Sequence, residues 1–239
     1  MRHLAIILLA LTLFLTGTVA ADTGEFEQLI KKKGPAAREV LEKPTLYRVA
    51  KIDGLPCTAD GFEFLLDRPR LSVALARKLD PGLDEYRIEV RPDGSYHLDD
   101  GGPLAGDMEI ISRQPGKRVY YLSGGWKFIW GIRFNGRMVL VPEYHENKTG
   151  AGKGVCRSVN ATARGYMKID SSLVGTVARL MAKLFPGKVD ARIARFSGSV
   201  RKVAIAISED PVKVYRVLRE TKGVPPEEVE EYRKVFIRK

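Results

Sequence analysis

The spacing of apolar residues divides the chain into a helical start, a strand-rich middle and a helical tail. Near the start, Phe26, Leu29 and Ile30 recur at helical spacing. Gly34-Pro35 interrupts this pattern before it resumes. We therefore predict a helical lead-in over residues 22–44.

A strand and two short helices are expected next. TLYRVAKI, residues 45–52, is rich in residues that favour strands. Apolar side chains then recur at helical intervals from Phe62 to Leu66 and again from Leu71 to Leu79, with Pro69 between the two pieces. Asp80-Pro81-Gly82 ends the second piece. The pattern predicts one strand followed by a pair of helices.

From residue 84 the apolar spacing changes to two, which is typical of strands with one buried face. Turn residues predict hairpins at Pro92-Asp93-Gly94 and Gln114-Pro115-Gly116, and Asn135-Gly136-Arg137 is a strong signal for a third. A last strand is predicted over 155–170. Together these segments favour an antiparallel sheet of about seven strands.

The tail is predicted to be helical. Ser171-Ser172 can cap one helix, and Pro186-Gly187 ends it. A second amphipathic helix is expected over 188–208, and further helices begin at Asp210-Pro211 and Pro225-Pro226.

The order of these elements resembles the helix-grip architecture of the START-like (SRPBCC) superfamily, which includes polyketide cyclases. The resemblance is carried by topology and by the segment LLDRPRLSVALARKLDPGLDEYRIEV, residues 65–90. It implies an α+β fold in which a curved antiparallel sheet wraps around a C-terminal helix and encloses an apolar cavity. It covers residues 45–185 and leaves 186–239 as a C-terminal helical extension, with 188–208 either in that extension or in the grip.

The same resemblance implies a lipid, sterol or aromatic ligand and no shared catalytic residue. On the predicted strands, bulky side chains share one face and small ones line the last strand. Two interpretations stay open, because these residues form either ordinary core or a ligand site. The candidate ligand-binding residues are Trp126, Phe128, Trp130, Leu140, Tyr144, Ala161 and Ala163.

An enzyme of the same fold, cyclase-like or hydrolase-like, is the second hypothesis. His97 and Asp99 share a strand face, as do Glu143 and His145. If the two strands met, these four side chains could perform acid-base chemistry or bind a divalent metal. The alternative is that they are ordinary polar positions at strand ends, and we expect no metal and no cofactor.

The first residues predict export. Arg2 and His3 precede an apolar run that ends at Leu15, and small residues follow to Ala21. This is the pattern of a signal peptide over residues 1–21, cleaved near Ala20/Ala21. The run is shorter than the ~20 apolar residues that span a membrane. We expect a periplasmic or secreted protein.

Export changes the meaning of the two cysteines. Cys57 and Cys156 lie 99 positions apart, too far for compact metal-ligand spacing. In an oxidising compartment a disulfide between them is expected, with two free thiols as the alternative.

The charge is strongly positive. The formal net charge is +11, of which Arg2 in the predicted signal contributes one. Such a surface favours anionic partners, and export makes nucleic acid the least plausible of them. The helix over 188–208 carries cations opposite an apolar stripe, which fits either a membrane-surface helix or a solvated helix over a core. Its candidate membrane-surface residues are Arg192, Arg195, Arg201 and Lys202.

The leading hypothesis is therefore an exported, non-enzymatic protein that binds a hydrophobic molecule, plausibly a membrane lipid, in an internal cavity. The third hypothesis is an envelope interaction protein whose core is filled.

Overall fold

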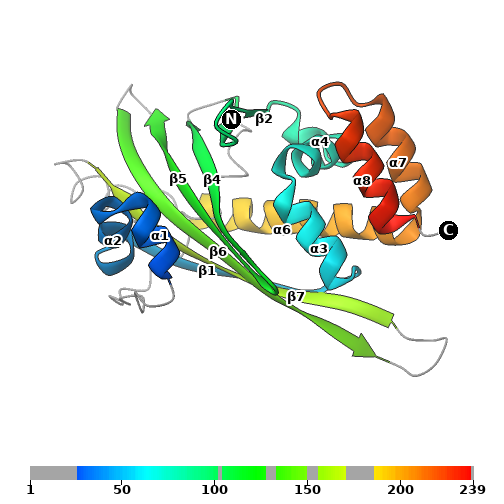
Figure 1. Ribbon diagram of the computed structural model, residues 1–239, viewed down its shortest axis with the longest axis horizontal. Helices are drawn as coiled ribbons and strands as arrows, with labels where there is room; N and C mark the ends of the chain where they lie inside the picture. The colour runs from blue at the N-terminus through cyan, green and yellow to red at the C-terminus, as the bar shows by residue number, and fades with distance from the viewer. Residues whose placement is uncertain (1–25, 102–103, 128–132, 150–155, 171–185, 238–239) are drawn as a thin grey trace.

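The computed structural model describes residues 26–101, 104–127, 133–149, 156–170 and 186–237. At 104, 126–127, 133–134 and 186–196 the description covers the backbone alone. Figure 1 shows one strongly twisted sheet, with helices α1 and α2 on one side and the other helices on the opposite side.

The sheet has seven antiparallel strands in the order β1-β7-β6-β5-β4-β3-β2. Consecutive strands from β2 to β7 are neighbours, and β1 closes the order by pairing with β7. The bounds are Leu46–Leu55 for β1, Arg87–Val90 for β2, Tyr96–Asp99 for β3, Leu104–Gln114 for β4, Lys117–Lys127 for β5, Arg133–Thr149 for β6 and Cys156–Ile169 for β7.

Between β1 and β2 the chain forms two helices, α3 (Ala59–Asp67) and α4 (Pro69–Leu79), and then the short 3-10 helix η3 (Pro81–Leu83). The Thr58 hydroxyl accepts a hydrogen bond from the Gly61 N–H and caps α3. Pro69 begins α4, where a residue without an N–H is tolerated. The predicted helix pair is confirmed.

The C-terminal part forms three of the predicted helices, and the helix predicted to begin at Ser171-Ser172 lies outside the described residues. The three are α6 (Pro186–Glu209), α7 (Pro211–Glu220) and α8 (Pro226–Phe236). Asp210 caps α7 by accepting from the Lys213 N–H. In the part of the chain that the structure describes, no helix is both long and apolar enough to cross a membrane.

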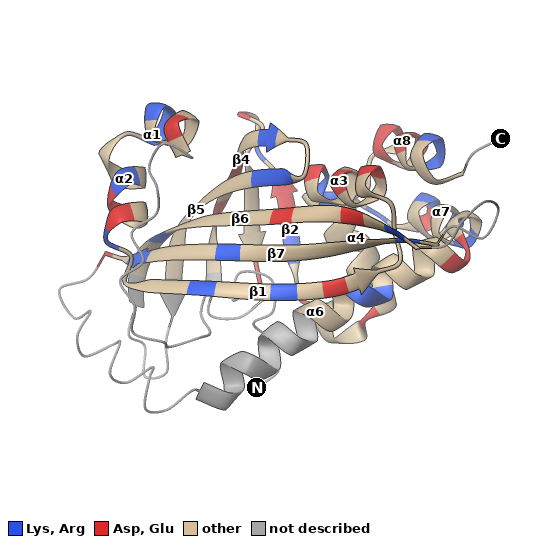
Figure 2. Ribbon diagram, turned by 90° about the horizontal axis from the view of Figure 1, so that it is seen from below, with Lys and Arg blue, Asp and Glu red and all other residues tan. Residues whose placement is uncertain are grey.

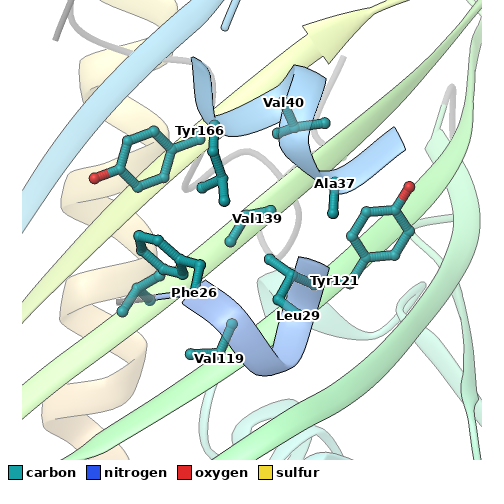
Figure 3. Packing of buried hydrophobic residues seen from close by; sticks show 10 residues of the cluster. Phe26, Leu29, Ala37, Val40, Val119, Tyr121, Val139 and Tyr166 are labelled. Carbon is teal, nitrogen blue, oxygen red and sulfur yellow. The ribbon is translucent and has the colours of Figure 1, made fainter. Parts of the chain in front are cut away.

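Both faces of the sheet are covered by helices. We call the face under α1 (Glu27–Lys33) and α2 (Pro35–Glu42) the outer face, and the face toward α3 and α6 the inner face. Figure 3 shows the outer cluster, in which side chains of α1 and α2 meet apolar side chains of β5, β6 and β7. Its buried members are Phe26, Leu29, Ala37, Val40, Leu41, Val119, Tyr121, Val139, Val141 and Tyr166.

Ion pairs and hydrogen bonds also hold α1 and α2 against the sheet. The Arg137 guanidinium on β6 pairs with Asp170, donates to Glu39 on α2 at 2.9 Å, and reaches the Ala36 carbonyl. Glu109 on β4 pairs with both Lys32 and Lys33 of α1. The lead-in is therefore part of the fold.

The C-terminal helices pack against the helix pair. A second buried cluster joins α3 and α4 to α6, α7 and α8, and contains Phe64, Leu71, Leu75, Val203, Ile207, Val214, Leu218, Val229 and Tyr232. Ion pairs from Arg68 to Glu231 and from Arg70 to Glu228 lie at its edge. In Figure 2, α6 runs alongside β1, and α7 and α8 gather at the far end of the sheet. The predicted α+β helix-grip arrangement is confirmed.

One predicted hairpin is wrong. β6 runs without a turn through Asn135-Gly136-Arg137. Gly136 pairs with Gly124 on β5, which pairs with Gly106 on β4. A Cβ atom at Gly124 would lie 2.5 Å from the Ala105 carbonyl oxygen, so β4 and β5 approach each other too closely here for a side chain. In the described ranges, six strands rather than seven follow the helix pair.

The predicted disulfide is also wrong, because both cysteines are free. Beyond the β1 register shift between Ile52 and Leu55, the chain turns into α3, and Cys57 packs against a buried apolar cluster. Cys156 begins β7 and is exposed. Burial raises the pKa of the Cys57 thiol to about 12, which leaves it a poor nucleophile at neutral pH.

The close approach of β4 and β5 at Gly124 gives a direct stability prediction. Gly124→Ala should lower the free energy of unfolding by about 1–3 kcal/mol, because its methyl group meets backbone that cannot move aside. Gly198→Ala in α6 is the matched control, because a Cβ there meets nothing within 4 Å. That change should be neutral or stabilising by up to about 1 kcal/mol. Urea unfolding measures the free energy of unfolding of both variants. Equal effects would contradict a close contact at Gly124.

Candidate functional site

The inner face is built from rows of side chains in register across the strands. One row runs Leu46, Met167, Met138, Leu122 and Met108 from β1 to β4. The next runs Arg48, Gly165, Leu140, Tyr120 and Ile110. A third contains Ala50, Ala163 and Pro142. The rows form a largely apolar surface with small side chains near its centre.

Two central positions of this surface are not fully buried. Leu140 and Ala163 are partly exposed, although Met138, Gly165 and Ala50 beside them are buried. β6 and β7 lie inside the sheet, where a fully covered face would bury every side chain. At Leu140 and Ala163 the inner face is therefore incompletely covered.

Toward α3 the inner face is filled. Tyr144 and Ala161, which are paired across β6 and β7, are buried with Phe62 of α3 and Ala204 of α6. The Phe62 and Tyr144 rings meet edge to face with centroids 5.1 Å apart. These two predicted ligand residues are thus core, whereas Leu140 and Ala163 are partly exposed.

The predicted aromatic stripe falls mostly outside the described residues. Trp126 ends β5 and its backbone pairs with Phe134 of β6, but its side chain is not described. Phe128 and Trp130 lie outside the described ranges.

Helix α3 is held on the sheet by a polar clamp that the sequence did not predict. Arg118 on β5, only 3% exposed, donates to both carboxylate oxygens of Asp67 at 2.8 and 3.0 Å. It also pairs with Glu63 at 3.1 Å. Tyr120 donates to the Leu66 carbonyl at 2.9 Å. Glu63 and Asp67 are four residues apart on one helix face, and this spacing was the available signal.

The contacts of the clamp lower the pKa of the Glu63 carboxyl group. Partial burial alone would raise the pKa of Glu63, but the Gly116 N–H and the Arg118 charge outweigh it and lower that pKa. Arg118 remains protonated, since its pKa is raised by Asp67 despite burial. The contacts are those of a structural ion-pair cluster.

The four residues of the enzyme hypothesis are not brought together. His97 and Asp99 lie on β3, whereas Glu143 and His145 lie on β6, with β4 and β5 between them. Three strand spacings separate the two pairs by about 14 Å. His97 contacts Asp107 at 2.7 Å, and Glu143 pairs with Arg164. Among the described residues, no group of three or more potential ligands could hold a metal ion.

The predicted membrane-surface residues are described in part. Arg201 and Lys202 are exposed on α6, but both make internal contacts. Arg201 donates to the Asp53 carbonyl at 2.6 Å, and Lys202 pairs with Asp80 at 3.4 Å. These contacts fasten the C-terminal half of α6 to β1 and α4. The side chains of Arg192 and Arg195 lie outside the described part.

Comparisons with known proteins add little. No family model matches the chain, and no curated protein matches it. Among solved structures, the crystal structure of Ara h 8.0201 is similar over 64% of this chain and 97% of its own, with 15% identity and a TM-score of 0.27. At that level the similarity carries no argument about fold or function.

Breaking the clamp should destabilise the protein. Arg118→Met leaves two carboxylates facing apolar surface, and we expect a loss of about 3 kcal/mol in the free energy of unfolding. Arg113→Met is the matched control, because Arg113 contacts the same Asp67 but is exposed. Its cost should stay below about 1 kcal/mol. Urea unfolding compares the two, and similar losses would refute a buried clamp.

The clamp also predicts acid sensitivity. Because the folded state lowers the pKa of Glu63, its ionised form stabilises the fold above the unfolded value of 4.5. That stabilisation is lost as the pH falls through the lower folded pKa. The free energy of unfolding should therefore drop between about pH 6 and about pH 3, with a shallower drop in Glu63→Gln. Identical pH profiles for the two proteins would exclude a contribution from Glu63.

Proposed function

We propose that this protein binds an apolar small molecule between the inner face of its sheet and α6. The observation that carries the proposal is the partial exposure of Leu140 and Ala163 at the centre of an otherwise buried face. α6 contacts β1 and lies on the inner side of the sheet (Figure 1). Binding sites for small molecules are typically concave, mostly apolar and already formed.

The lining suits such a ligand. Met108, Met138 and Met167 lie buried on the row beside this region, where their flexible side chains can repack around a ligand of irregular shape. In the neighbouring row Gly165 has no side chain, and in the third row Ala50 and Ala163 have only small ones. These positions would leave room for the ligand. Apolar area removed from water would contribute about 25 cal/mol per Å² to binding.

The proposal makes the protein a START-like carrier rather than an enzyme. Its support is that the histidines with neighbouring carboxylates lie on separate strands. It includes export through the segment 1–21, on the basis of the signal-peptide pattern. It also includes ligand exchange at an anionic membrane surface, supported by the exposed Arg201, Lys202 and Ile205 of α6.

Filling the space should abolish binding. In Ala163→Trp an indole ring would occupy the region beside Leu140, and we expect binding of the neutral fluorophore N-phenyl-1-naphthylamine to weaken by at least about tenfold. Thr162→Trp is the control, because residue 162 lies next along β7 and points to the outer face. Fluorescence titration measures both variants after circular dichroism has verified their folds.

Two results would overturn the proposal. One is equal affinity of the folded Ala163→Trp and Thr162→Trp variants for the fluorophore. The other is the absence of saturable binding by the unaltered protein.

A further inference from the structure

The second half of β4 has a free edge. The pairing of β3 with β4 ends at Tyr96 and Met108, whereas β5 pairs with β4 as far as Gln114. Among the described residues, no strand therefore lies beside residues 109–114 on the β3 side. A free strand edge presents a row of N–H and C=O groups that can pair with another extended chain. At about 3.3 Å per residue, this edge is about 20 Å long.

A pocket lies beside this edge, between α1 and the outer face of β4. Phe26 and Leu29 of α1 and Val119 of β5 form an apolar wall (Figure 3), and Ser112 and Gln114 of β4 add polar groups. The volume is about 180 Å³, and a cavity of about 150 Å³ is large enough to hold benzene. The pocket therefore suits one aromatic or large aliphatic side chain.

A β-bulge shapes this pocket. Ile110 pairs with Tyr120 and Ser112 pairs with Val119, so Ile111 is an extra residue in β4. Both Ile111 and Ser112 consequently line the pocket, although neighbouring residues of a regular strand point to opposite faces. Bulges are over-represented next to functional sites, where they re-aim a side chain. Val119 belongs to the outer cluster, which places the pocket on the face opposite the proposed ligand site.

The charge around the edge favours an acidic partner. Lys32 and Lys33 share the single carboxylate of Glu109, the first residue of the free edge, and the exposed Lys31 precedes them on α1. This end of the edge therefore carries an excess of positive charge. Glu27, at the other end of α1, is the carboxylate that lines the pocket. The net charge of +11 on the whole chain acts in the same direction as the lysines.

We propose that the free edge of β4 and the pocket beside α1 bind an extended, acidic segment of a partner protein. The segment pairs with β4 along residues 109–114 and places one apolar side chain in the pocket. In this mode of recognition, backbone hydrogen bonds provide affinity and side-chain pockets provide specificity. The site is separate from the apolar ligand site proposed for the inner face.

A phage-displayed library of random peptides, selected on the full chain, supplies the probe. The selected sequences should share a negative net charge and an apolar residue flanked by residues that favour strands. Fluorescence polarisation then measures the affinity of the best peptide after synthesis. N-methylation of every second amide should weaken binding by at least about tenfold for one set of amides and leave it unchanged for the other, because only one edge of an added strand pairs with β4.

Ser112→Trp places an indole ring in the pocket and should weaken binding of the same peptide by at least about tenfold. Ser123→Trp is the matched control, because Ser123 is exposed on the outer face of β5 and lies outside the pocket lining. Its affinity for the peptide should equal that of the unaltered protein. Circular dichroism verifies the folds, and Gln114→Trp, at an exposed position of the lining, replaces Ser112→Trp if that variant does not fold.

Three results would overturn the inference. One is a selection that yields no binding peptide, and another is equal affinity of the folded Ser112→Trp and Ser123→Trp variants for the peptide. The third is equal sensitivity of the two sets of amides to N-methylation, which would exclude strand addition. A dimer of the unaltered protein that Ser112→Trp dissociates, measured by analytical ultracentrifugation, would instead assign the site to a second copy of this chain.

Discussion

Both faces of the central sheet carry large apolar side chains, and the rest of the molecule is arranged to keep them from water. Antiparallel sheets commonly leave one face solvated, so a sheet buried on both faces needs two sets of helices. On the outer face α1 and α2 cover Val139 and Tyr166. On the inner face α3 and α6 cover Tyr144 and Val159. The segment before β1 is therefore as necessary to the fold as the C-terminal helices.

The two faces are covered differently, and this difference provides the proposed site. The outer face is covered by α1 and α2 and by the ion pairs of Arg137 and Glu109, and a pocket beside α1 is lined by Phe26, Ile111 and Val119. The inner face is closed firmly at the α3 end, where Arg118 joins the helix to the sheet. Farther along, Leu140 and Ala163 are partly exposed beside small residues. A rigid clamp next to a region of small residues is suited to a preformed cavity.

Most of the helices and strands could be predicted from the sequence, because residues close together along the chain determine where they begin and end. Asp210 with Pro211 begins α7 through a cap and a fixed backbone angle, which neighbouring residues alone determine. Gly136 was misread because its role depends on Gly124, which lies on a neighbouring strand. The clamp and the buried Arg48 were missed for the same reason. A charged residue in an alternating strand is assigned to solvent until the partner strands are known. The separation of Cys57 and Cys156 along the chain did not indicate that both thiols would be free.

The proposed site requires that the inner face hold an apolar molecule in the native protein. Organic extraction of the protein, purified from its native host without detergent and followed by mass spectrometry, tests this directly. We predict one class of apolar molecule at close to one equivalent, reduced strongly in Ala163→Trp and retained in Thr162→Trp. Extracts of the unaltered protein that contain no such molecule, or equal amounts from both variants, would contradict it.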